Sequence, residues 1–190
     1  MQLSSTEKIL SSAKECFFQH GYSAANITMI AKYADISRVT IHKQFTSKEI
    51  LFRAVVEQYI QENLTLLEQY ALSINDFWSD TEDFLLQRCG GLFDEIPSAV
   101  IRSDLLHAGQ SYCQDIIQEN ELRVRENIDH RISQELAAKR MTLEHINISQ
   151  QEFSRVIETA PFGLALSTLN EDNKSYVKSL MKVYKAATTV

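Results

Sequence analysis

Apolar side chains recur every three or four positions along most of the chain, which is the period of an α-helix. The stretch 26–45 shows this period in two short runs. In the first run, four apolar residues share one helical face: Ile27, Ile30, Ala31 and Ala34. In the second run, Ile41 and Phe45 stand four positions apart and face the same way. The pattern predicts two short helices joined by a tight turn.

The turn between the two runs is Asp35-Ile36-Ser37. Aspartate tolerates the left-handed backbone that ends a helix, and serine can cap the helix that follows. Asn26 is placed to cap the first of the two helices in the same way. Ala31 is small enough to let the two helices approach closely. The segment is therefore predicted to be a helix-turn-helix.

The second of these helices is predicted to turn a donor-rich face outward. Six of its residues point away from the apolar side: Arg38, Val39, Thr40, His42, Lys43 and Gln44. None of them carries a carboxylate. A surface of this kind suits the floor of the DNA major groove and the phosphates beside it. The helix therefore predicts DNA binding.

A helix on each side completes the N-terminal region. Before the motif, Ser4 and Glu7 have the spacing of a capping box. The apolar stripe that follows consists of Ile9, Ala13, Cys16 and Phe17. Gly21 is placed to stop this first helix. After the motif, Thr46 and Glu49 are predicted to form the capping box that opens a fourth helix.

The rest of the chain has the pattern of a larger helical domain. Gly90-Gly91 and Pro97 interrupt the period and predict a bend between two helices. A long amphipathic helix is predicted from Asp115 to Ala138, and Ser149 with Glu152 is predicted to cap the first of two terminal helices. We therefore expect an all-α fold: an N-terminal three-helix helix-turn-helix DNA-binding domain plus a larger helical domain.

The two predicted domains are residues 1–47 and 48–190. Charged residues are distributed unevenly along the chain. The formal net charge of −6 at pH 7 would by itself argue against nucleic acid. Residues 1–53, however, carry seven basic and four acidic residues, a balance of +3, whereas the remainder holds 12 basic and 21 acidic residues, a balance of −9. A basic head on an acidic body can direct its positive end toward DNA.

The amino-acid composition further restricts the class of protein. With 190 residues and 44% hydrophobic content the chain can bury a real core, and five Gly and two Pro argue against a β-rich or disordered chain. No signal peptide or membrane span is expected, and three widely spaced cysteines indicate reduced, buried thiols in a cytoplasmic protein. No phosphate-binding loop, nucleophile elbow or metal-ligand spacing is visible, so no enzyme, cofactor or metal site is predicted.

Residues 9–52 resemble the DNA-binding domain of the TetR family of transcriptional regulators. The resemblance rests on FFQHGY at the end of the first helix, ITMIAKYADIS in the motif, RVTIHKQF for the recognition helix and TSKEILF at the start of the fourth helix. Asp35 stands where the family usually has Gly, His42 where it usually has Tyr, and Gln44 often corresponds to His.

The resemblance implies a homodimeric, ligand-responsive regulator, most often a repressor, that binds a pseudo-palindromic operator in double-stranded DNA. The residues expected at the DNA are Asn26, Thr28, Ser37, Arg38, Val39, Thr40, His42, Lys43, Gln44 and Lys48. Two recognition helices double the contacts that one can make, which also favours a dimer. The dimer interface is expected in the terminal helices, at Phe153, Val156, Ile157, Ala160, Leu164, Tyr176, Leu180 and Tyr184.

The resemblance also implies that the larger helical domain is a ligand-binding and dimerisation domain, with an unidentified small-molecule effector held among the middle helices. Candidate wall residues are Phe77, Trp78, Phe84, Phe93, His107 and Tyr112. The same side chains fit an ordinary helical core, and an intramolecular core is the alternative for the terminal helices. The larger domain could also be a protein-interaction module without a ligand, which a collapsed interior would favour. An enzyme would require a polar catalytic cluster, and the sequence offers none.

Overall fold

The computed structural model describes residues 4–90, 94–96, 98–165 and 173–190. Within these ranges the chain forms helices and connections, and no strand. The predicted all-α fold is confirmed. None of the helices in these ranges is both long enough and apolar enough to cross a membrane.

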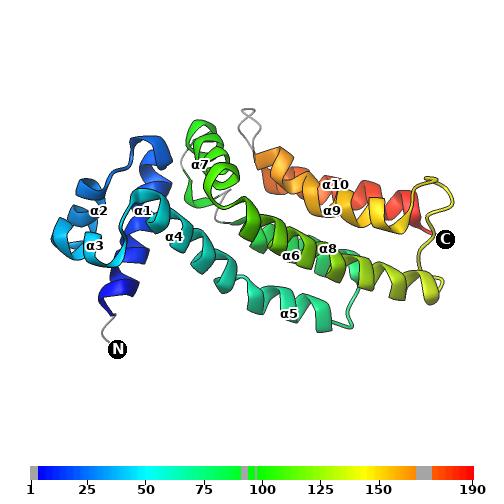
Figure 1. Cartoon of the computed structure of the whole chain (residues 1–190). Coiled ribbons are helices and arrows are strands. Elements are labelled where there is room, and N and C mark those ends of the chain that lie inside the picture. Colours follow the sequence, from blue (N-terminus) through cyan, green and yellow to red (C-terminus); the bar gives the residue numbers. More distant parts are fainter. Residues whose placement is uncertain (1–3, 91–93, 97, 166–172) are drawn as a thin grey trace. The chain divides into compact units, whose positions relative to one another are not determined.

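Figure 1 labels the helices in chain order. The first five are α1 (Ser5–Ala24), α2 (Ile27–Ala34), α3 (Arg38–Gln44), α4 (Lys48–Glu62) and α5 (Leu64–Leu72). The others are α6 (Phe77–Arg88), α7 (Ala99–Tyr112), α8 (Gln114–Ala137), α9 (Gln150–Ala165) and α10 (Asn173–Thr188).

The helices fall into two compact units. The first comprises residues 1–62 and 95–117, and the second comprises residues 63–94 and 118–190. The first unit therefore takes in α7 besides α1–α4. These units are defined by packing, and the functional division between residues 47 and 48 stays a prediction.

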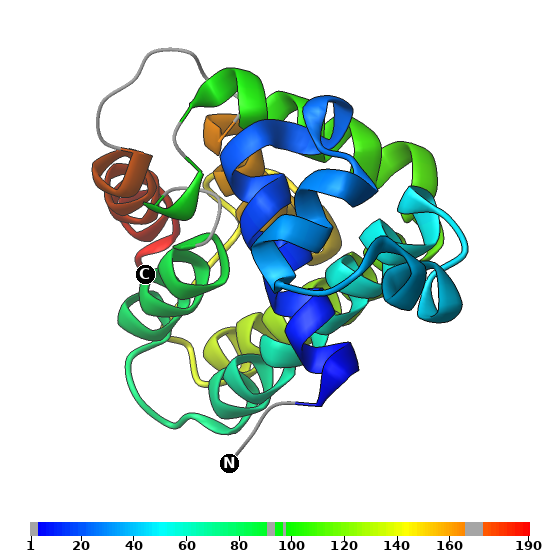
Figure 2. The same ribbon diagram turned by 90° about the vertical axis from the view of Figure 1, so that its left-hand side faces the viewer.

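In the first unit, α1 packs against α2, α4 and α7 (Figures 1 and 2). The predicted apolar stripe of α1 is completely buried: Ile9, Ala13, Cys16 and Phe17. The Phe17 ring meets the Phe52 ring of α4 edge-on, with 5.1 Å between centroids. Helix α2 buries Ile30 and Ala34 completely and α3 buries Ile41 completely, so both helices of the predicted motif are anchored by apolar packing.

The second unit has its own core. The long helix α8 contributes Val124, Ile128 and Ile132, which stand four positions apart and are buried. Helix α10 packs against both α6 and α9, and the Trp78 and Phe153 rings lie 6.3 Å apart between centroids. The predicted long amphipathic helix is thus confirmed, with each end within one residue of the expected position.

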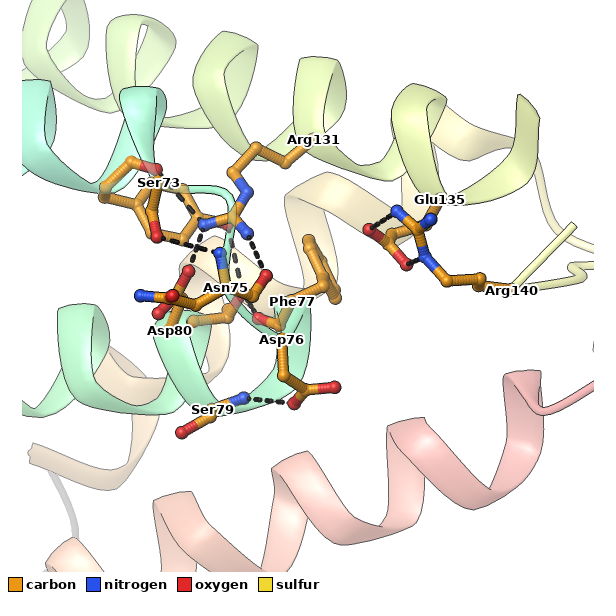
Figure 3. A network of polar contacts seen from close by, with 11 residues as sticks. Ser73, Asn75, Asp76, Phe77, Ser79, Asp80, Arg131, Glu135 and Arg140 are labelled. Carbon is orange, nitrogen blue, oxygen red and sulfur yellow. Dashed lines mark hydrogen bonds and ion pairs between the residues drawn. The ribbon is translucent and has the colours of Figure 1, made fainter. Parts of the chain in front are cut away.

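A buried arginine holds the connection between α5 and α6 against α8 (Figure 3). Arg131 is 3% exposed. Its Nη1 donates to the Tyr70 carbonyl at 3.2 Å and to Asp80 Oδ2 at 2.8 Å, and its Nη2 donates to the Asn75 carbonyl at 3.2 Å. Burial opposes ionisation of Asp80, but hydrogen bonds with Ser73 and Arg131 lower the pKa of its carboxyl group. The guanidinium charge is therefore neutralised inside this unit.

Two of the three predicted capping boxes are confirmed. At the start of α1, the Glu7 amide donates to Ser4 Oγ at 3.2 Å and the Ser4 amide donates to Glu7 Oε2 at 2.7 Å. At the start of α9, the Glu152 amide donates to Ser149 Oγ at 3.2 Å, and the Ser149 amide donates to the Glu152 carboxylate at 2.8 Å.

The prediction that Thr46 caps α4 is wrong by one residue. The cap is Ser47, whose Oγ accepts a hydrogen bond from the Ile50 amide at 3.2 Å. Phe45 still donates its amide to the last turn of α3, so the chain needs two further residues before a new helix can begin. Glu49, the other half of the predicted box, instead accepts a hydrogen bond from the Tyr22 hydroxyl.

Candidate nucleic-acid interface

The helix-turn-helix has the caps that its sequence predicts. Asn26 Oδ1 accepts a hydrogen bond from the Met29 amide at 3.1 Å and starts α2. Asp35 ends α2 in the left-handed conformation, with φ 49° and ψ 49°. Ser37 Oγ then accepts from the Thr40 amide at 3.1 Å and starts α3. These local contacts fix where α3 begins and which of its faces points outward.

Helix α3 buries one side and exposes the other. Ile41 and Phe45 are buried, as predicted, whereas Val39 is 64% exposed although it is apolar. The other outward residues are Arg38, His42, Lys43 and Gln44, which are exposed, and Thr40, which is half-buried. Within the described ranges, the side chains of Arg38 and Lys43 form no hydrogen bond or ion pair. Their charges are therefore available to an external anion.

A shallow hollow lies between α2 and the start of α3. Its lining residues are Thr28, Ala31, Lys32, Asp35, Ile36, Ser37 and Arg38. The Thr28 hydroxyl, the Lys32 ammonium and the Arg38 guanidinium are hydrogen-bond donors, whereas Asp35 is the one acid of the lining. The hollow thus presents mainly donors, which suits a phosphate or a base edge.

Two residues expected at the DNA make contacts inside the first unit. The amide of Gln44 both accepts from and donates to hydroxyls in the first turn of α1, at 2.9 and 3.1 Å. Lys48 Nζ donates to the carbonyls of Tyr22 and Ala25 at 2.9 and 3.1 Å. An ammonium group has three donors, so a phosphate contact by Lys48 would use the third. The roles of Gln44 and Lys48 at DNA stay predictions.

The three cysteines are free and buried, as expected. Burial raises the pKa of Cys89 and of Cys113 to about 11. Because the thiolate is the nucleophilic and metal-binding form, these side chains act as core residues. In the part of the chain that the structure describes, no three metal-ligating side chains gather.

The expected effector-binding residues are divided between the two units. Three of them lie in α6, in the second unit. Phe77 and Phe84 are core residues, and Trp78 is half-buried. His107 and Tyr112 lie in α7, in the first unit, and both are exposed. Phe93 lies outside the described residues. The six therefore do not form one wall within either unit.

The second unit contains a buried polar cluster that was not predicted from the sequence. Arg88 of α6 and Glu158 of α9 form an ion pair, with 3.4 Å between Nη2 and Oε1, and their side chains are 7% and 3% exposed. Burial raises the pKa of Glu158, and the charges of Arg88 and Arg125 oppose that shift. The Nε of Arg125 is itself buried without a hydrogen-bond partner among the described residues. Because these charged residues lie on separate helices, no short-range pattern in the sequence could predict that they meet.

The expected dimer residues are partly internal. Phe153 and Ile157 are buried within a single chain, whereas Val156 and Tyr176 are 43% and 53% exposed. Three more are half-buried: Ala160, Leu180 and Tyr184. The Leu164 side chain lies outside the described part of the structure. The exposed pair is available to a partner, and the buried pair can only support such a surface from beneath.

Comparison with known proteins connects residues 9–55 to one family. A sequence profile described as bacterial regulatory proteins, tetR family, matches residues 9–55. Over 51 residues the chain is 39% identical to the HTH-type transcriptional repressor ComR of Escherichia coli (strain K12). That alignment covers 27% of this chain and 24% of ComR, about a quarter of each.

The fold extends the likeness to nearly the whole chain. A TetR transcription regulator from Haloarcula marismortui ATCC 43049 superposes with a TM-score of 0.78 at 16% identity, over 98% of each chain. SmeT, the repressor of the Stenotrophomonas maltophilia multidrug efflux pump SmeDEF, gives a TM-score of 0.73 at 15% identity, over 100% of this chain and 92% of SmeT. At such low identity these two structures support the fold alone.

Proposed function

Since residues 9–55 match the TetR family of bacterial regulatory proteins, we propose that the chain is a repressor that binds operator DNA through the outward face of α3. We propose a regulator and not an enzyme because the family that matches residues 9–55 is described as bacterial regulatory proteins. A protein that binds an operator works where the DNA is, so we propose a cytoplasmic location. Repression is proposed because ComR and SmeT are both named repressors.

The observation that carries the proposal is the pair of unpaired basic side chains on the acid-free outward face of α3. Arg38 and Lys43 are exposed and have no hydrogen-bonding or ionic partner among the described residues. A guanidinium can contact guanine O6 and N7 with two hydrogen bonds, and an exposed valine such as Val39 can contact a thymine methyl group. Asn26, Thr28, Ser37, Thr40 and His42 would add contacts at the edges of the same surface.

We further propose that two copies of the chain bind together. A single helix as short as α3 reads few base pairs, whereas a two-fold dimer reads two half-sites of a pseudo-palindrome. Support comes from α9 and α10, where Val156, Tyr176 and Val183 are apolar or aromatic and exposed. Surface of this kind is stabilised when a second copy covers it.

Regulation by a small-molecule effector is proposed for residues 48–190, with DNA contact assigned to residues 1–47. The second unit combines the half-buried Trp78 with the buried Arg88–Glu158 pair. An apolar wall with a few polar groups is the usual composition of a small-molecule site. An effector that binds one conformation better than the other changes operator affinity by its differential affinity, about 1–3 kcal/mol in typical regulators.

The test of the proposed function is a salt titration of DNA binding. Because exposed Lys and Arg would displace counterions from phosphates, the affinity for duplex DNA should fall steeply and linearly on logarithmic axes as salt rises. Fluorescence anisotropy of a labelled duplex measures this directly. An affinity that does not change with salt, or no binding at low ionic strength, would contradict the proposal.

A further inference from the structure

Residues 21–25 form the turn that leads from α1 into α2, and this turn is held by a residue far along the chain. Gly21 interrupts α1 with φ 79° and ψ 169°, a conformation that favours glycine. A Cβ atom built on Gly21 would lie 2.5 Å from Oδ2 of Asp104, which belongs to α7. The absence of a side chain at residue 21 is therefore what lets the Asp104 carboxylate approach the turn.

The Asp104 carboxylate receives the donors of this turn. The Ser23 amide donates to Asp104 Oδ2 at 2.9 Å, and the Ser23 hydroxyl donates to Oδ1. Burial opposes ionisation of Asp104, but the hydrogen bonds from Ser23 and from the Tyr22 amide, together with the charge of Lys48, lower the pKa of its carboxyl group. Asp104 is thus ionised when it holds the turn.

Lys48 holds the acceptors of the same turn. Its ammonium donates to the Tyr22 and Ala25 carbonyls and lies 4.1 Å from the centroid of the Tyr22 ring. Ala25 directly precedes Asn26, the cap of α2. The Asp104 carboxylate of α7 therefore binds a backbone N–H donor of the segment that leads into α2, and the Lys48 ammonium of α4 binds two of its carbonyl acceptors.

Helix α7 is also fastened at its other end. The Arg53 guanidinium of α4 donates to the Tyr112 carbonyl at 3.3 Å and forms two hydrogen bonds with the Asp115 carboxylate, at 2.7 and 2.6 Å. The hydrogen bonds from Arg53 lower the pKa of Asp115 to about 2. Because this second pair is exposed, we expect little energy from it, and it provides a matched control.

We propose that Asp104 is a positioning residue for operator binding: from α7 it holds the turn that sets the N-terminus of α2. The proposal rests on the proposed function, since it takes α2 and α3 as the DNA-binding elements. A recognition surface that is held in place before binding loses less freedom when DNA arrives. Without Asp104, the folded protein would have to order this turn at the moment of binding.

The test compares Asp104→Asn, Ser23→Ala and the control Asp115→Asn. Asparagine keeps the shape of Asp104 but replaces one acceptor oxygen with a donor that faces the turn. At a temperature well below unfolding, Asp104→Asn and Ser23→Ala should each weaken binding to the same duplex about tenfold. The double variant should lose less than the two single losses combined, because both changes disrupt the hydrogen bond between the Ser23 hydroxyl and Asp104. Asp115→Asn should bind like the wild type.

Hydrogen exchange separates positioning from general destabilisation. In Asp104→Asn, amides 22–30 should exchange faster while those of α8 and α10 stay unchanged. Wild-type affinity in Asp104→Asn, or equally faster exchange throughout the chain, would overturn the proposal. If the wild type bound no duplex, the proposed function would fail, and Asp104 could have no role in operator binding.

Discussion

Two arginines, one in each unit, show how the surroundings of a side chain decide its role. Arg38 of α3 is exposed and has no side-chain partner within the described ranges. Arg131 of α8 is 3% exposed and is bonded to one carboxylate and two carbonyls. The first guanidinium keeps its donors for an external acceptor, whereas the second has its donors engaged within the protein. A count of basic residues cannot make this distinction.

The two units also differ in where charged side chains contribute to their structure. In the second unit, charge is buried in the core, at Arg131 and at the Arg88–Glu158 pair. In the first unit, Arg102 of α7 is also buried, but the stripe of α1 that forms the core is apolar, and two charged side chains at its edge, Asp104 and Lys48, hold a backbone turn. On the outward face of α3, the basic side chains Arg38 and Lys43 have no internal partner within the described ranges.

Removing the buried arginine should have the largest effect on stability. Arg131→Ala leaves Asp80 and two carbonyls without their donor, and losing one partner of a buried pair costs about 3–5 kcal/mol. Urea unfolding measures the change. Arg140→Ala is the control, since Arg140 is exposed and pairs with Glu135 at the surface, and it should cost at most about 1 kcal/mol. Equal losses in both variants would contradict this account.

The second-largest effect on stability is expected from Gly21→Ala in the first unit. Gly21→Ala forces a side chain into a positive-φ position and against Asp104, and we expect a loss of about 1–3 kcal/mol in the free energy of unfolding. Gly90→Ala serves as the control, because a Cβ atom there meets nothing within 4 Å. Thermal unfolding of the two variants distinguishes them. A stable Gly21→Ala protein would show that the turn is not under this constraint.

Removing the exposed arginine should change binding without changing stability. Arg38→Ala is expected to cost about 1–3 kcal/mol in operator affinity, equivalent to about 5- to 150-fold, and less than about 0.5 kcal/mol in unfolding. Arg123→Ala, at an exposed arginine of α8, should leave both unchanged. If Arg38→Ala instead unfolded the protein and Arg131→Ala spared it, the comparison of the two arginines would be wrong.

The smallest expected effect is a dependence on acid pH. The pKa of Asp104 is lower in the folded protein than its ordinary value. Its contribution to stability is therefore present at neutral pH and is lost as the pH falls below about 4. Urea unfolding should show wild type more stable than Asp104→Asn at neutral pH, with the difference shrinking in acid. A difference that persists unchanged in acid would mean that the charge of Asp104 does not contribute.

Local features of the fold could be predicted from the sequence, because each depends on residues a few positions apart. The Asn26 and Ser37 caps, the left-handed Asp35 and the burial of Ile41 are of this kind. The shift of the α4 cap to Ser47 depends on how far α3 continues, which the spacing of side chains does not determine.

Contacts between distant residues could not be predicted in this way. Asp104 and Ser23 are 81 positions apart, and neither sits in a pattern that points to the other. Lys48 has the sequence position of a phosphate anchor, yet its ammonium contacts two carbonyls of the α1–α2 turn. Such a pairing exists only once the helices have packed, so a single sequence carries no sign of it.

The central claim is that the outward face of α3 reads DNA in two symmetric copies. Selection of bound duplexes from a random pool tests it most directly, with Arg38→Ala selected in parallel. We predict that the wild type enriches an inverted repeat whose half-sites are about one helical turn apart, or a multiple of it, and that Arg38→Ala loses preference within each half-site. Enrichment of no sequence, or of the same unpaired site by both proteins, would contradict the claim.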